Sequence, residues 1–67
     1  MSIFSDRLAE LRNKKGISQA VAAKEFEIGS RTYQYYEKGE REPQLSTLIR
    51  IADFYGVTLD YLAGRTN

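Results

Sequence analysis

The apolar residues of this chain recur at the spacing of helices, and glycines separate one group from the next. Phe4, Leu8 and Leu11 stand at positions i, i+4 and i+7, which places them on one face of a helix over residues 3–15. Gly16 follows as a helix-ending residue. No segment alternates apolar and polar residues as a half-buried strand does, so we expect helices only.

Further breaks, at residues 27–29, at residues 39–43 and at Gly56, divide the remainder into four more predicted helices. Their ranges are 18–26, 30–38, 45–55 and a short last segment capped by Thr58. The apolar face expected for the fourth helix comprises Leu45, Leu48, Ile49, Ala52 and Tyr55. The pattern therefore predicts an all-α fold of five helices around a small core.

Three tyrosines fall within four positions of the third predicted helix, and helical geometry separates them. Tyr33 and Tyr36 lie three residues apart on one face and are expected to pack inward. Tyr35 falls on the remaining surface. That surface also carries Ser30, Arg31, Gln34 and Lys38.

Composition limits the chemistry that this chain can perform. Its 67 residues include no cysteine and no histidine, which excludes disulfides, Cys or His metal sites, and Ser-His or Cys-His nucleophilic pairs. A chain this short has little room for a deep cleft. Asp53 and Asp60 could be imagined as a carboxylate pair, but a surface residue and a first-turn acid explain them better. We expect no enzyme, no cofactor and no metal.

The net charge of +1, from 10 basic and 9 acidic residues, does not by itself indicate a nucleic-acid partner. Only the placement of the charges can decide that question. The opening residues MSIFSDRLAE are charged too early for a signal peptide, and Arg50 and Asp53 interrupt the longest apolar run. The expectation is a cytoplasmic protein with no membrane partner.

The second and third predicted helices are short and are separated by a three-residue break, which is the arrangement of a helix-turn-helix motif. In that arrangement the second helix of the pair enters the major groove, and its N-terminal residues reach the base edges. Arg31 stands at that end, with Gln34 and Tyr35 one turn further on. Arginine can pair with guanine and glutamine with adenine.

The run ISQAVAAKEFEIGSRTYQYYEKGEREPQLSTLIRIADFYGVTLDYL resembles the Cro/C1-type (XRE-like) helix-turn-helix domain of phage repressors and bacterial transcriptional regulators. The motifs that carry the resemblance are Ser18-Gln19, Tyr36-Glu37-Lys38-Gly39, Pro43 and Gly56-Val57-Thr58-Leu59-Asp60. The resemblance implies a compact lambda-repressor-like DNA-binding domain over residues 4–63. Its motif would span about 18–38, and residues 64–67 would be a tail or the start of a linker.

The resemblance also implies roles for individual residues. Base-reading positions are matched by Ser30, Arg31, Gln34 and Tyr35, and phosphate-contacting positions by Ser18, Gln19, Lys38 and Arg41. Arg12 and Glu37 match a structural ion pair between the first and third helices. The implied assembly is a homodimer on a two-fold DNA operator, a repressor that is nucleoid-associated when bound. Its contacts would lie at the end of the fourth helix and in the fifth, near Tyr55, Val57, Leu59 and Leu62.

Several residues depart from the family pattern. Glu27 stands at the usual turn glycine, which costs roughly 1–2 kcal/mol if the residue is left-handed. Ala22 replaces a usual leucine and Tyr33 a smaller aliphatic residue, so we expect the two volume changes to compensate. Glu40 and Glu42 would repel phosphate.

Two alternatives stay open at this point. Considered apart from the rest of the motif, Arg31 could be a solvated cation, Tyr35 an exposed aromatic residue and Gln19 an ordinary helix-start residue. The whole domain could also be a protein-interaction module, such as an antitoxin or an antirepressor partner, that keeps the fold without reading DNA.

Overall fold

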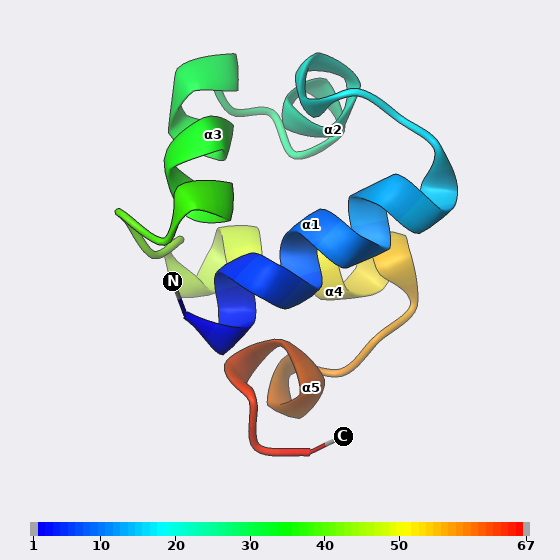
Figure 1. Cartoon of the computed structure of the whole chain (residues 1–67), viewed down its shortest axis with the longest axis vertical. Helices are drawn as coiled ribbons and strands as arrows, with labels where there is room; N and C mark the ends of the chain where they lie inside the picture. The colour runs from blue at the N-terminus through cyan, green and yellow to red at the C-terminus, as the bar shows by residue number, and fades with distance from the viewer. Residues whose placement is uncertain (1, 67) are drawn as a thin grey trace.

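Five helices joined by short loops make up the fold (Figure 1). The computed structural model describes residues 2–66, and these contain no strand. The helices are α1 (Ile3–Lys15), α2 (Gln19–Glu25), α3 (Ser30–Lys38), α4 (Leu45–Tyr55) and α5 (Leu59–Ala63). The prediction of five helices is confirmed, with bounds that agree to about one residue. None of the described helices is long and apolar enough to cross a bilayer.

The helix ends follow local signals in the sequence. The hydroxyls of Ser18 and Thr58 accept hydrogen bonds from backbone N–H groups and so cap α2 and α5. At the start of α1, Ser2 and Ser5 form a reciprocal capping box, which satisfies the fully buried Ser5. Gly39 ends α3 in the left-handed conformation, with φ 78°.

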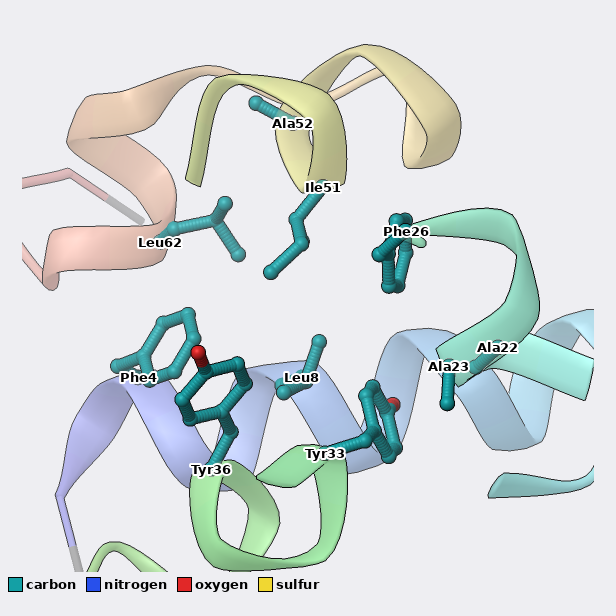
Figure 2. Packing of buried hydrophobic residues seen from close by; sticks show 10 residues of the cluster. All are labelled: Phe4, Leu8, Ala22, Ala23, Phe26, Tyr33, Tyr36, Ile51, Ala52 and Leu62. Carbon is teal, nitrogen blue, oxygen red and sulfur yellow. The ribbon is translucent and has the colours of Figure 1, made fainter. Parts of the chain in front are cut away.

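The core lies where α1 crosses between the α2–α3 pair and the α4–α5 pair (Figures 1 and 2). Its buried apolar residues are Phe4, Leu8, Ala22, Ala23, Phe26, Tyr33, Tyr36, Ile51, Ala52 and Leu62. Tyr33 and Tyr36 point inward as predicted. The Tyr33 ring stacks on Phe26, with 6.2 Å between ring centroids.

The packing between α2 and α3 agrees with the expectation that the large Tyr33 compensates for the small Ala22 in volume. Tyr33 is fully buried, and its ring is directed towards the side of the core where Ala22 and Ala23 lie (Figure 2). A solvent-exposed Tyr33 would have contradicted the expectation. A large side chain on α3 thus meets small side chains on α2.

The inner face of α4 differs from the prediction. Leu45 and Ile49 were placed on it, but they are 65% and 42% exposed, whereas Ile51 is fully buried. The buried stripe runs through residues 48, 51, 52 and 55, one row away from the row through 45 and 49. Apolar residues occupy both rows, so periodicity alone could not select the correct one.

Residues 64–66 fold back against α1. The Arg7 guanidinium donates hydrogen bonds to the carbonyl oxygens of Tyr61 and Thr66, and it lies 4.2 Å from the centroid of the Tyr61 ring. The described part of the predicted tail therefore packs on the helical domain. Asn67, the last residue of that predicted segment, lies outside the described residues.

Candidate nucleic-acid interface

The turn between α2 and α3 forces one residue into a strained conformation. Glu27 has φ 57°, and no other non-glycine residue in the described part of the chain has a positive φ. This conformation costs an L-residue roughly 1–2 kcal/mol. The Glu27 carboxylate also pairs with Arg50 of α4 at 3.2 Å, but both side chains are largely exposed, so the pair offsets little of that cost. No pattern in the sequence indicated this pairing.

The carboxylate of Glu37 joins three helices. Arg12 of α1 donates to it through Nε at 2.6 Å and Nη2 at 3.2 Å, and Gln19 of α2 donates through Nε2 at 3.1 Å. Arg12 also donates to the carbonyl oxygen of Ile17 at 2.9 Å. The ion pair expected between Arg12 and Glu37 is therefore present, and Gln19 extends it. This Glu37 node fixes the last turn of α3 against α1 and the start of α2.

The surroundings of the Glu37 node keep its charges in place. Burial acts to raise the pKa of Glu37, but the hydrogen bonds from Arg12 and Gln19 outweigh it and hold that pKa below its usual value. The bond to Glu37 in turn raises the pKa of Arg12. Both groups are consequently charged at neutral pH, as a tight ion pair requires.

Two buried tyrosine hydroxyls lie beside the Glu37 node. Burial, followed by the neighbouring Glu37 carboxylate, raises the pKa of Tyr33 well above its ordinary value, and burial raises the pKa of Tyr55. Neither hydroxyl has a partner in hydrogen-bonding geometry within residues 2–66. Both side chains are therefore neutral in the folded protein over the physiological range.

The outward side of α3 is polar and accessible. Ser30, Arg31, Gln34 and Lys38 are exposed, and Tyr35 is half-buried. Arg31 and Gln34 thus lie on the surface and not against the interior. Arg41, which follows α3 in the loop, places its guanidinium carbon 4.6 Å from the centroid of the Tyr35 ring. Periodicity could not predict this contact, because it depends on how the chain turns at Gly39.

The charges around α3 become more favourable to an anion once the ion pairs are considered. Glu37 and Glu27 are neutralised by partners in α1 and α4. Four cations of the α2–α3 region form no ion pair within residues 2–66: Lys24, Arg31, Lys38 and Arg41. The exposed acids that remain there are Glu25, Glu40 and Glu42. The surface is thus weakly cationic, with its arginines at the two ends of α3.

The start of α2 keeps donors available next to α3. The Ser18 oxygen accepts from the Val21 N–H, which leaves the hydroxyl proton free to be donated. The Gln19 amide uses one N–H on Glu37 and retains a second.

The residues expected at a dimer contact differ in their exposure. Leu59 is 36% exposed, Val57 and Tyr55 are half-buried, and Leu62 is fully buried in the core. The Tyr55 ring packs edge-on against Phe26 and Phe54, with centroids 5.9 and 5.0 Å away. Of the four, Leu59 offers the most surface.

Comparison with known proteins places this arrangement in a family. A family model described as helix-turn-helix matches residues 8–62. The HTH-type transcriptional regulator ImmR of Bacillus subtilis is 39% identical over 59 residues, which are 88% of this chain and 46% of that protein. The regulator AnsR of the same organism is 45% identical over 60 residues, covering 90% and 52% of the two chains.

A phage protein and a solved structure give the same result. The cryptic phage CTXphi transcriptional repressor RstR of Vibrio cholerae is 37% identical over 57 residues, or 85% of this chain and 51% of RstR. A transcriptional regulator from Listeria innocua superposes with a TM-score of 0.88 at 30% identity, covering 96% of this chain and 60% of the other. This chain spans about half the length of the curated relatives it matches. It belongs to the helix-turn-helix family.

Proposed function

We propose that this protein is a sequence-specific, double-stranded-DNA-binding transcriptional regulator that inserts α3 into the major groove. The observation that carries the proposal is an exposed polar row on a helix anchored from behind by the Glu37 node. Relatives covering most of this chain are named transcriptional regulators and repressors, which supports the same assignment. The function requires binding alone and no catalysis, and it is exercised in the cytoplasm, on the nucleoid.

The dimensions of α3 suit a base-reading element. An α-helix with its side chains is about 10–12 Å across, which fits the ~12 Å width of the major groove, and the nine residues of α3 give it a length of about 13 Å. Arg31 at the start of the helix can donate two hydrogen bonds to guanine, and Gln34 can pair bidentately with adenine. Ser30 can bond either base type, and Tyr35 completes the row beside a thymine methyl or a sugar.

Phosphate contacts are proposed on both sides of this row. Ser18 and Gln19 offer a hydroxyl proton and an amide N–H at the start of α2, where the backbone amides also favour an anion. Lys38 and Arg41 offer cations at the other end of α3. Such contacts fix the orientation of the protein on the duplex without reading sequence.

A dimeric repressor is the proposed working form. The described domain measures 28 × 22 × 21 Å. Two copies side by side can therefore place their α3 helices in successive major grooves, about 34 Å apart, on a two-fold operator. The contact is proposed at the end of α4 and in α5, through Leu59 with Val57 and Tyr55. The repressor name of the phage relative RstR agrees with this mode of action.

A protein-interaction module that has kept the fold is the second candidate. It is favoured by the three exposed acids Glu25, Glu40 and Glu42 on the surface that would face DNA. Salt discriminates the two functions. A DNA reader loses affinity steeply as salt rises, because each phosphate contact releases counterions. An interaction module would not retard a duplex at any salt concentration.

Selection from a randomised duplex pool tests the proposal directly. Wild type should select a two-fold sequence, and Arg31→Ala should select the same sequence with relaxed preference at one symmetric position. Arg65→Ala is the matched control, since Arg65 is exposed and pairs with Asp60 of α5, and α5 lies at the opposite end of the molecule from the start of α3 (Figure 1). If Arg31→Ala and wild type select identical sites, Arg31 is not a reader, and failure of wild type to enrich any duplex removes the function.

A further inference from the structure

Arg41 adopts a position that its neighbours in the chain do not explain. It is flanked by Glu40 and Glu42, yet it forms an ion pair with neither of them in the structure of residues 2–66. Its guanidinium instead lies over the ring of Tyr35, with the guanidinium carbon 4.6 Å from the centroid. A ring face attracts a cation through its quadrupole, and a planar guanidinium stacks on it.

The end of α3 brings these two residues together. Gly39 takes the left-handed conformation, and the Glu40 N–H donates to the Tyr35 carbonyl oxygen at 3.0 Å. This hydrogen bond returns the chain over the last turn of the helix. The residue that follows, Arg41, is therefore delivered to the side of α3 where Tyr35 stands.

We propose that Tyr35 is a positioning residue, which holds the Arg41 guanidinium at the C-terminal end of α3 for a backbone phosphate of DNA. This inference rests on the proposed DNA-binding function and changes the part that Tyr35 plays in it. Because Arg41 covers one face of the ring, Tyr35 acts chiefly through that cation and not through a base. Without the ring, Arg41 would be free to turn towards Glu40 or Glu42, where it would be neutralised.

The stack itself can be tested without DNA. In the NMR spectrum, ring current should shift the side-chain δ protons of Arg41 upfield in wild type and in Tyr35→Phe, which keeps the ring. The shift should vanish in Tyr35→Leu, whose fold is checked by the dispersion of the remaining amide signals. Random-coil δ-proton shifts in wild type would overturn the proposal at this first stage.

A double-mutant cycle on the duplex selected by wild type tests the role in binding. Tyr35→Phe should bind as wild type does, whereas Tyr35→Leu should lose about two- to fivefold in affinity. Arg41→Ala should also lose affinity, with a salt slope smaller by about one. In the Arg41→Ala background, Tyr35→Leu should cause little further loss, because the cation that the ring positions is already absent.

The outcomes separate this inference from the function on which it rests. Direct base reading by Tyr35 would be shown if Tyr35→Leu lost the same affinity with and without Arg41, or if it relaxed the base preference. Either result would overturn the positioning role alone. Loss of affinity in Tyr35→Phe equal to that in Tyr35→Leu would do the same, because the hydroxyl and not the ring would matter. A wild-type protein that binds no duplex overturns both proposals.

Discussion

Removing the arginine of the Glu37 node should be among the most damaging single substitutions in this chain. In the folded protein the Arg12 and Glu37 side chains are only 16% and 8% exposed. Arg12→Ala would leave a nearly buried carboxylate whose remaining donor is the neutral amide of Gln19. Breaking a buried pair by deleting one partner costs about 3–5 kcal/mol, and the residual exposure of this pair favours the low end, about 3 kcal/mol.

That loss is large against the whole stability of the domain. At about 0.05–0.15 kcal/mol per residue, a chain of 67 residues has roughly 3–10 kcal/mol in total. Equilibrium unfolding in urea, followed by far-ultraviolet circular dichroism, measures the difference. The matched control is Arg12→Met combined with Glu37→Met. It removes both charges together and should stay within about 1 kcal/mol of wild type, because no unpaired charge remains.

The pH dependence of stability provides an independent check that the loss comes from the unpaired Glu37 carboxylate. The pKa of Glu37 is lowered below its ordinary value of 4.5, so the stability contributed by this carboxylate is present above that value and is lost as pH falls through the folded-state pKa. In Arg12→Ala the carboxylate is unpaired, and protonation relieves its burial. Burial without Arg12 raises the pKa of Glu37, so the difference in unfolding free energy between Arg12→Ala and wild type should begin to narrow above pH 4.5 and should keep narrowing below it. A loss under about 1 kcal/mol at neutral pH, or a double variant as unstable as the single one, would refute the reasoning.

Three further outcomes follow from the same structure. Glu27→Gly should raise the free energy of unfolding, measured by urea denaturation, by up to about 1 kcal/mol, because relief of the left-handed strain exceeds the loss of the exposed pair with Arg50. Glu27→Gln keeps the strain and should give no gain in stability. The raised pKa of Tyr33 contributes stability that is present below the unfolded value of about 10 and lost as pH rises above it. Tyr33→Phe should therefore be at least as stable as wild type at pH 7, because the buried hydroxyl has no partner within residues 2–66, and its advantage should grow at about pH 11. Lys38→Ala should reduce the salt slope of duplex binding by about one in gel-shift titrations, and Arg65→Ala, which removes an exposed cation after α5, should not.

Most of the fold could be predicted because its helix boundaries depend on local chemistry. Ser18, Thr58 and the glycines mark helix ends whatever the tertiary structure. The choice between the two apolar rows of α4 is different, because Leu45 and Ile51 are equally apolar in the sequence. Only the position of α4 relative to α1 and α5 buries one and exposes the other, and periodicity contains no information about that position.

The residues of the candidate site likewise divide into those whose placement could be predicted from the sequence and those whose placement could not. Helical geometry placed Tyr33 inward and Arg31 outward, since both assignments depend only on the turn of α3. The Arg12–Glu37 pair could be expected through the family resemblance and not from the residues themselves, because it joins distant helices. The contact between Tyr35 and Arg41 could not be predicted at all. It requires the chain to reverse at Gly39, and the acidic neighbours of Arg41 suggested the opposite arrangement.

The balance of charge around α3 has a consequence for the way in which the proposed regulator would distinguish sites. Non-specific DNA affinity comes almost entirely from phosphate neutralisation, and around α3 the described residues include four cations without an ion-pair partner and three exposed acids. Such a surface binds arbitrary duplex weakly. A larger share of the operator affinity must then come from base contacts, which require α3 to be held in a fixed orientation. The Arg12–Glu37 pair supplies that rigidity from the buried side of α3. A variant of this pair that still folds should therefore lose discrimination between operator and random duplex before it loses binding altogether.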